Sequence, residues 1–386
     1  MSVEKINIEQ FLELAKDHPV IDVRSPAEYK HAHIPGAYSL PLFTDEERKV
    51  VGTTYKQQSR EAAIKIALDY FGPKMKKMIE EVESLVKSPE SGVKNHTVAS
   101  DSRLPSHDSR LILLYCWRGG MRSAGVAWLL DLYGFKVYTL IGGYKKFRHY
   151  VLDTFKLPFD FKILGGFTGS GKTELLRSLE KKGNSVINLE EIAQHKGSAF
   201  GNIGMPEQPG QEMFENLLAQ KLRNQLAISS SQLYKAQTTN RKLPTANCIW
   251  LEDESQRIGL VNIPNDLWKT MRRSPVYFIK IPFEERLKHL VREYGVLDKQ
   301  KMIDAIGRIK ERLGGLNAKN AIQFLDEGNI TESFRVLLQY YDKYYLKALH
   351  NREDINSLLH TVDCDSVTIE NADKLVSPFQ YHSEDR

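Results

Sequence analysis

Short apolar runs and amphipathic segments alternate along the chain, which is the pattern of an α/β protein. Continuous apolar runs predict buried parallel strands, and they occupy residues 20–23, 111–115, 137–141, 161–165, 247–251 and 275–281. Apolar residues at helical spacing predict helices at residues 8–16, 61–87, 126–133, 175–179, 214–227 and 284–294, and throughout 298–349. We expect two parallel α/β domains, of which the second ends in a helical region.

Motifs and composition divide the chain near residue 150. We expect residues 1–150 and 151–386 to form the two domains, with residues 149–159 as a connector. Residues 88–110 lose all periodicity and are rich in Ser, Asp, His, Pro and Asn, so they predict an insertion that takes no part in a site. The tail after Asn351 matches no pattern and receives no assignment.

The composition is that of an ordinary globular protein, 41% hydrophobic and 27% charged over 386 residues. No apolar stretch is long enough to span a bilayer and no signal-peptide core is present, so we expect a cytoplasmic protein with no membrane partner. The cysteines Cys116, Cys248 and Cys364 lie far apart and have no metal-ligand spacing. The net charge of +5 permits a nucleic-acid partner without demonstrating one.

A cysteine follows the apolar run at 111–115 directly, in the segment Cys116-Trp-Arg-Gly-Gly-Met-Arg-Ser123. Unpaired N–H groups at the start of the next helix, together with Arg118 and Arg122, favour a bound anion and the thiolate form of Cys116. The spacing Cys116-x5-Arg122 is that of cysteine-dependent phosphatases, in which the thiolate attacks phosphorus. It is also similar to the active-site loop of rhodanese domains, in which the thiolate carries sulfur or selenium. The loop alone leaves both interpretations open.

The segment Gly166-Phe-Thr-Gly-Ser-Gly-Lys-Thr173 fits the phosphate-binding pattern G-x-x-x-x-G-K-[ST], between a predicted strand and a predicted helix. We expect backbone amides to cradle phosphate oxygens, Lys172 to reach across them and the Thr173 hydroxyl to hold Mg²⁺. The candidate phosphate or diphosphate ligands are Gly166, Thr168, Gly169, Ser170, Gly171, Lys172 and Thr173. Glu252 and Asp253 follow a predicted strand and are candidates to orient that ion.

Together these segments resemble the bacterial tRNA 2-selenouridine synthases, in which a rhodanese domain is fused to a P-loop domain. The matching segments are Asp22-Val-Arg24, His33-Ile-Pro-Gly-Ala37, Glu46-Glu-Arg48, Val51-Gly-Thr53, Tyr55-Lys56, the two loops, His195-Lys-Gly-Ser198, Phe200-Gly201, Gln208-Pro209, Glu252-Asp-Glu-Ser255 and Arg257-Ile-Gly259. The resemblance implies a rhodanese-like α/β domain followed by a P-loop NTPase-like parallel α/β domain. It implies an enzyme that converts wobble 2-thiouridine to 2-selenouridine in tRNAs for Lys, Glu and Gln.

The resemblance also implies a reaction in two steps. Geranyl diphosphate first geranylates the sulfur, and selenophosphate then supplies selenium through a Cys116 perselenide, with Arg118 and Arg122 holding the phosphate. The implied partners are tRNA, geranyl diphosphate and selenophosphate, with selenophosphate synthetase as the candidate supplier and no tightly bound cofactor. Assigning geranyl diphosphate to the P-loop is an inference, because an ATP-driven activation of the base would use the same loop.

Scattered lysines and arginines do not mark an RNA surface, and our candidates for tRNA binding are Lys145, Lys146, Arg272 and Arg273. Tyrosines within residues 340–345 offer rings for base stacking, although tyrosines at helical spacing more often pack in a core.

Three other functions remain open at this stage. A cysteine phosphatase joined to a kinase-like domain predicts phosphate release from an aryl phosphate. A thiosulfate sulfurtransferase uses Cys116 but gives Lys172 no role. A non-catalytic tRNA-binding or sulfur-carrier module predicts that substitution of Cys116 or Lys172 leaves function intact.

Overall fold

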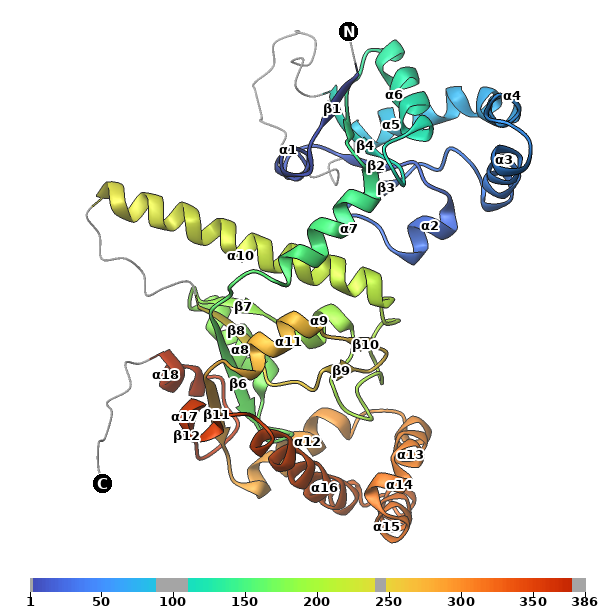
Figure 1. The fold of residues 1–386 in the computed structure, drawn as a ribbon. Coiled ribbons are helices and arrows are strands. Elements are labelled where there is room, and N and C mark those ends of the chain that lie inside the picture. The colour runs from blue at the N-terminus through green and yellow to red at the C-terminus, as the bar shows by residue number, and fades with distance from the viewer. Residues whose placement is uncertain (1–2, 88–109, 240–247, 377–386) are drawn as a thin grey trace. The chain divides into compact units, whose positions relative to one another are not determined.

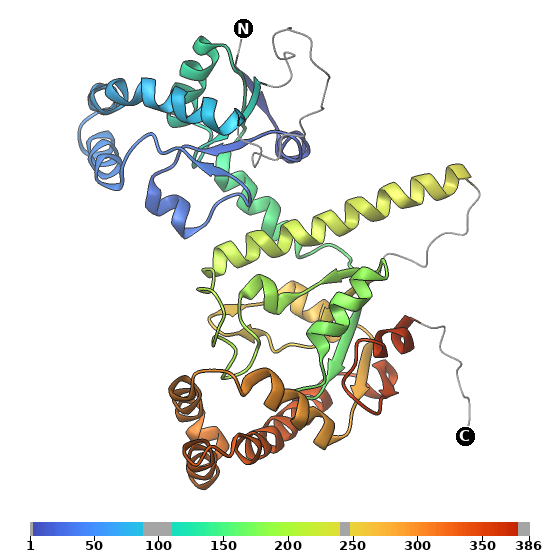
Figure 2. The same cartoon turned by 180° about the vertical axis from the view of Figure 1, so that it is seen from behind.

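The computed structural model describes residues 3–87, 110–239 and 248–376. The chain forms two compact units, Met1–Asp153 and Thr154–Arg386, here named unit 1 and unit 2. Each contains a five-stranded parallel sheet accompanied by helices (Figures 1 and 2). The α/β class with parallel sheets is therefore confirmed, whereas the insertion expected at 88–110 lies outside the described residues except for Arg110.

The sheet of unit 1 has the strand order β1-β5-β4-β2-β3, and all neighbours are parallel. Its strands are β1 Glu4–Ile6, β2 Val20–Asp22, β3 Tyr38–Ser39, β4 Leu111–Tyr115 and β5 Lys136–Leu140. Its helices are α1 Ile8–Leu14, α2 Pro26–His31, α3 Asp45–Gln57, α4 Arg60–Phe71, α5 Met75–Lys87, α6 Met121–Tyr133 and α7 Gly143–Thr154. Every residue of the central strand β4 is buried, as expected for a parallel strand covered on both faces.

The helix expected at 61–87 is two helices, which corrects the sequence prediction. A 3-10 turn at Gly72–Lys74 separates α4 from α5. Pro73 lies in this turn and has no N–H group to continue the hydrogen-bond ladder of α4.

The connector expected at 149–159 begins inside a helix, which is a second correction. Helix α7 runs from Gly143 to Thr154, and its side chains Tyr144, Phe147 and Val151 are buried at helical spacing. The helix therefore belongs to the packed structure of unit 1.

A buried charged pair joins three elements of unit 1. Arg24 donates to Asp22 Oδ2 over 2.6 Å, and both side chains are almost completely buried. The Tyr115 hydroxyl at the end of β4 donates to the same oxygen at 2.8 Å. The Arg24 guanidinium also lies 3.9 Å from the ring centroid of Tyr144 on α7. The pair thus holds β2, β4 and α7 together at the carboxyl edge of the sheet.

The sheet of unit 2 has the order β12-β11-β6-β8-β7, again with parallel neighbours. Its strands are β6 Phe161–Gly166, β7 Ser185–Ile187, β8 Ile249–Glu252, β11 Val276–Lys280 and β12 Leu359–Asp363, and a separate antiparallel pair is β9 Arg257–Ile258 with β10 Val261–Asn262. The helices beside the sheet are α8 Lys172–Lys181, α9 Leu189–Ala193, α10 Gln211–Thr239, α11 Asn265–Arg272, α12 Phe283–Tyr294, α17 Ile355–Leu358 and α18 Asn371–Val376.

The helical region expected at 298–349 is confirmed. It consists of α13 Lys299–Arg308, α14 Lys310–Leu313, α15 Gly315–Asp326 and α16 Ile330–His350. The tail after Asn351 is more ordered than the sequence suggested, because it contributes the edge strand β12, which pairs with β11 over five residues.

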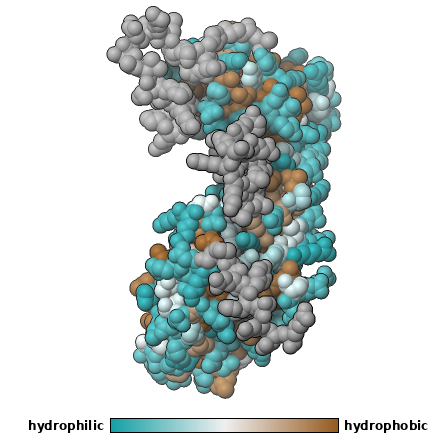
Figure 3. All heavy atoms as spheres, turned by 90° about the vertical axis from the view of Figure 1, so that its left-hand side faces the viewer, coloured by the Kyte–Doolittle hydropathy of each residue, from teal (hydrophilic) through white to brown (hydrophobic). Residues whose placement is uncertain are grey.

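None of the helices in the described part of the chain is long and apolar enough to cross a membrane. Figure 3 shows one face of the molecule, on which hydrophilic residues predominate and hydrophobic residues are scattered among them.

We predict that Arg24→Met lowers the free energy of unfolding by about 3–5 kcal/mol, because it leaves the buried Asp22 carboxylate without its cation. Tyr115→Phe removes a single hydrogen bond and should cost about 1 kcal/mol. Denaturant titration followed by tryptophan fluorescence measures both values. Arg60→Met, on the exposed first turn of α4, is the control. Equal stability of Arg24→Met and wild type would contradict the role given to the pair.

Candidate active sites

The cysteine loop of unit 1 begins where β4 ends. Cys116 follows Tyr115 directly and is buried, and α6 starts five residues later at Met121. The Gly120 N–H donates to Cys116 Sγ at 3.3 Å, and the Ser123 hydroxyl lies 3.2 Å from the same sulfur. The Ser123 hydroxyl also donates to the Gly120 carbonyl at 3.0 Å, so it ties the sulfur to the backbone of the loop. The strand before Cys116 and the helix after its loop are both present, as predicted.

The start of α7 fixes the backbone of this loop. The Tyr144 and Lys145 N–H groups donate to the carbonyls of Cys116 and Trp117, at 2.8 and 3.0 Å. Gly143 has a φ of +57°, and a Cβ at this position would lie 2.2 Å from the Cys116 carbonyl oxygen. Only glycine fits such an approach without displacing the loop.

The two arginines of the loop have different surroundings. Arg118 is exposed to solvent. Arg122 is partly buried, and its Nη1 donates to Glu28 Oε2 at 2.6 Å, while Arg48 Nε lies 3.2 Å from the same oxygen. Burial opposes ionisation of Glu28, but the hydrogen bond and charge of Arg122 outweigh it and lower the pKa of Glu28 to about 2. An anion bound at Cys116 therefore competes with a charged Glu28 for Arg122.

The phosphate-binding loop of unit 2 connects β6 to α8, as predicted. Lys172 Nζ donates to the Gly166 carbonyl at 3.0 Å, so the lysine bends back over its own loop. Gly169 has a φ of +80°, and a Cβ there would lie 2.9 Å from the Arg286 carbonyl oxygen. Arg286 in turn donates to the Thr168 carbonyl at 3.1 Å and forms a buried ion pair with Asp342. Helices α12 and α16 thereby support the loop from outside.

Three glutamates gather beside Thr173. The Thr173 hydroxyl donates to Glu190 Oε2 at 3.2 Å, and the Glu190 N–H donates to Glu252 Oε1 at 2.7 Å. Burial and the neighbouring Glu190 carboxylate raise the pKa of Glu252 to about 8. Burial raises the pKa of Glu190 as well, and burial with the charge of Glu190 raises that of Glu254. The cluster therefore carries less negative charge at neutral pH than its composition suggests.

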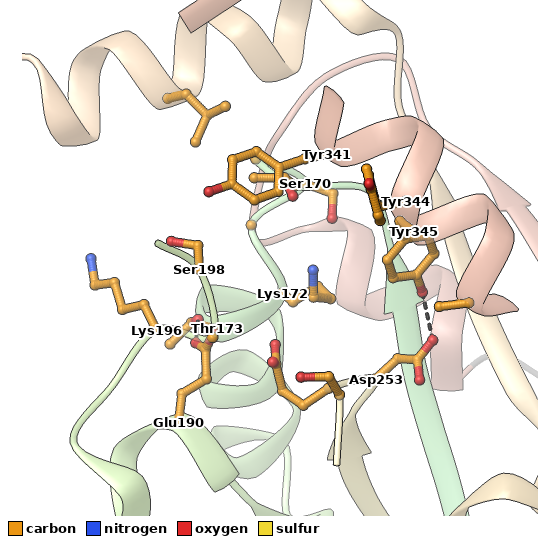
Figure 4. Close-up of a pocket in the computed structure, with 18 of the residues that line it drawn as sticks. Ser170, Lys172, Thr173, Glu190, Lys196, Ser198, Asp253, Tyr341, Tyr344 and Tyr345 are labelled. Carbon is orange, nitrogen blue, oxygen red and sulfur yellow. Dashed lines mark hydrogen bonds between the residues drawn. The ribbon is translucent and has the colours of Figure 1, made fainter. Parts of the chain in front are cut away.

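Asp253 lies beside the cluster but already has protein partners. The Tyr345 hydroxyl donates to Asp253 Oδ2 at 2.7 Å (Figure 4), and Arg352 Nη2 forms an ion pair with Oδ1. This geometry therefore does not support the prediction that Asp253 orients magnesium. Among the described residues no three His, Cys, Asp or Glu side chains converge as metal ligands. Thr173 with Glu190 and Glu252 is the arrangement that fits an ion bridging to a bound phosphate.

A cavity of about 720 Å³ opens over the phosphate-binding loop. Figure 4 shows Lys172, Thr173 and Glu190 around it, with Lys196 and Ser198 on the adjoining segment. Tyrosines of α16 and Trp268 of α11 also line the cavity. The tyrosines of residues 340–345 thus combine core packing with a place at the rim of a site.

The candidate tRNA-binding residues occupy different surroundings. Lys145 and Lys146 are exposed on the first turn of α7, next to the cysteine loop. Arg272 lines the cavity of unit 2 and donates to the Ala348 carbonyl at 3.3 Å, whereas Arg273 is exposed at the end of α11. Their binding to RNA stays a prediction.

Several residues at these sites were not predicted as site residues, among them Glu28, Glu190, Glu254 and Arg352. Glu28 closes a capping box with Ser25 at the start of α2, a position that gives no sign of its contact with Arg122. Arg352 lies in the tail after Asn351, which matched no sequence pattern.

Two family models match the chain. One describes a rhodanese-like domain and matches residues 7–150, and the other describes the tRNA 2-selenouridine synthase AAA domain and matches residues 159–368. These two matches include Cys116 and the phosphate-binding loop, respectively.

Curated relatives match along most of the chain. A tRNA 2-selenouridine synthase from Bdellovibrio bacteriovorus is 32% identical over 91% of this chain and 94% of its own length. One from Hydrogenovibrio crunogenus is 33% identical over 86% and 89%, and one from Pseudomonas putida W619 is 32% identical over 78% and 77%. Because the matches at this identity span nearly the whole chain, the chain belongs to the tRNA 2-selenouridine synthase family of enzymes.

Proposed function

We propose that the chain converts wobble 2-thiouridine to 2-selenouridine in tRNAs for Lys, Glu and Gln, by geranylating the sulfur and then exchanging it for selenium. The observation that carries this proposal is the presence of a cysteine loop and a phosphate-binding loop in one chain of this family. A loop with a polarised thiol suits selenium transfer, and the second loop suits the diphosphate of an alkyl donor. A simple sulfurtransferase uses only the first loop.

Geranylation is assigned to unit 2. The sulfur of 2-thiouridine attacks the first carbon of the geranyl group, the C–O bond breaks with its electron pair on oxygen, and diphosphate leaves. The base loses its N3 proton to solvent in this step, so the S-geranyl product is neutral. Loop amides and Lys172 stabilise this anion once Lys172 releases the Gly166 carbonyl. Magnesium would neutralise further charge on the diphosphate. Thr173 and Glu252 would hold it, since the buried Glu252 Oε2 has no hydrogen-bond partner among the described residues.

Selenium transfer is assigned to Cys116. The thiolate attacks the selenium of selenophosphate, an S–Se bond forms, and the P–Se bond breaks with its electron pair on phosphorus, which leaves as phosphite. Arg118 and Arg122 bind the phosphorus oxygens during this step. The selenium of the perselenide then attacks C2 of the S-geranyl base and geranylthiolate leaves. Two thiols, oxidised to a disulfide, cleave the remaining S–Se bond and release 2-selenouridine.

We predict that the two loops can be separated by mutation. With 2-thiouridine RNA and geranyl diphosphate, Lys172→Ala should lower the geranylation rate by roughly 10²–10³-fold, because an anion-stabilising donor is lost. Cys116→Ser should geranylate normally but fail to convert S-geranyl RNA with selenophosphate and thiol. Nucleoside mass spectrometry follows both products, and the reactions contain no ATP.

Matched controls are Cys364→Ser, at another buried free cysteine, and Lys181→Ala, at the far end of α8. If Cys116→Ser converts S-geranyl RNA at the wild-type rate, the reaction does not pass through a Cys116 perselenide. Dependence of geranylation on ATP would assign the loop to activation of the base instead.

The phosphorus product gives an independent test of the perselenide. Our scheme predicts one phosphite per 2-selenouridine, measured by ³¹P nuclear magnetic resonance. Direct attack of selenophosphate on the base, followed by hydrolysis, would yield phosphate. Phosphate as the sole product of coupled turnover would therefore contradict transfer through Cys116.

We predict that Glu28→Gln lowers the KM for selenophosphate by roughly three- to tenfold. The substitution removes the negative charge that competes for Arg122 while it keeps an acceptor of similar shape. Steady-state selenation of S-geranyl RNA measures the constant, and Glu46→Gln on α3 is the control. A higher KM in Glu28→Gln would show that the Glu28 charge positions Arg122 for the ligand.

A further inference from the structure

A second cavity lies within unit 1, between helices α3 and α4 and the loop that follows Cys116. Its volume is about 980 Å³, and most of its wall is apolar, including Leu68, Phe71, Met75, Trp117, Met121 and Trp128. Sites for small ligands have volumes of about 300–1,000 Å³ and are lined mainly by apolar side chains. The cavity therefore has the size and the lining of a site for a hydrocarbon group.

Several of these side chains remain uncovered. The exposed fractions of Leu68, Met121 and Trp128 are 56%, 50% and 53%. Neighbouring apolar side chains that stay in contact with water mark a place where a ligand or partner binds. Trp117 and Met121 line the cavity and belong to the loop and helix that follow Cys116, so the cavity adjoins the cysteine loop.

Two glycines line the cavity. Gly52 lies within α3 and Gly125 within α6, and neither has the positive φ that would require glycine. A Cβ at Gly52 would meet nothing within 4 Å, and one at Gly125 would touch only Phe71, at 3.8 Å. Glycine is a poor helix former, so backbone geometry does not explain either residue. Both residues line the cavity, and the absence of a side chain leaves room at these positions.

The charged residues of the wall are all basic: Arg48, Lys49, Lys56, Arg118 and Arg122. An apolar chamber with a cationic rim is complementary to a hydrocarbon chain attached to a polyanion. A hydrocarbon ligand without an anionic group would fill the apolar chamber but make no ion pair with the basic rim.

We propose that this cavity binds the geranyl chain of S-geranyl-2-thiouridine tRNA during selenation. The inference rests on the proposed two-step function, and it places the geranyl group of the intermediate in this cavity. While the base faces Cys116, the hydrocarbon fills the chamber and tRNA phosphates face the basic rim. As the bond from selenium to C2 forms, the bond from C2 to sulfur breaks with its electron pair on sulfur, and geranylthiolate is left in the cavity.

The test compares leaving groups of different length on preformed substrates. Short RNAs carrying S-geranyl or S-dimethylallyl 2-thiouridine are treated with selenophosphate and thiol, and kcat/KM is measured for each. Gly52→Leu fills the chamber and should lower the preference for geranyl over dimethylallyl by on the order of tenfold or more. Leu68→Asn, at a side chain that is already exposed, should lower the same preference without affecting folding.

Gly307→Leu makes the same change on α13, where a Cβ would meet nothing within 4 Å, and should leave the preference unchanged. If wild type fails to convert S-geranyl RNA, the proposed function itself fails. If wild type converts it and both cavity variants keep the wild-type preference, the cavity assignment alone is overturned. If the cavity variants instead raise the KM for geranyl diphosphate in the geranylation assay and keep the wild-type preference for geranyl over dimethylallyl, the cavity binds the free donor. That result would also overturn the proposal.

Discussion

Close packing of backbone against two glycine-rich loops is the constraint on which both sites depend. In unit 1 the Gly143 α-carbon approaches the Cys116 carbonyl so closely that a Cβ would lie 2.2 Å from its oxygen. In unit 2 Gly169 approaches the Arg286 carbonyl in the same way. Each loop follows a central parallel strand, where unpaired peptide groups gather at the carboxyl edge of a sheet. The packing holds these groups in place before any ligand arrives, so little ordering cost falls on binding.

Three polar side chains of the two loops already have protein partners. Arg122 binds Glu28, Lys172 binds the Gly166 carbonyl, and Thr173 binds Glu190. Ligand binding at either loop is therefore an exchange of partners. Buried polar groups without partners are costly, and these contacts satisfy the groups in the free protein. The strength of each contact then helps to set the affinity for the incoming anion.

Sequence reasoning succeeded where the signal is local. The strands before Cys116 and Gly166 are continuous apolar runs, and each loop carries its own spacing of glycines and cations. It failed where a residue acts through a distant partner. Nothing near Arg352 indicates that it pairs with Asp253, and β12 is a short edge strand that only its register with β11 defines. Glu28 lies in the first turn of α2, and its contact with Arg122 joins residues 94 positions apart.

The place of β12 in the sheet has a consequence for biosynthesis. The strands of unit 1 have all been synthesised once the ribosome has passed Leu140. The sheet of unit 2 begins with β6 at residue 161, but it is complete only when its edge strand β12 has been synthesised and can pair with β11. Domains generally fold as units during synthesis. A nascent chain can therefore form its cysteine loop while the phosphate-binding half still lacks its edge strand and the Arg352 partner of Asp253. During translation, the second half of this protein depends for longer on protection from aggregation than the first.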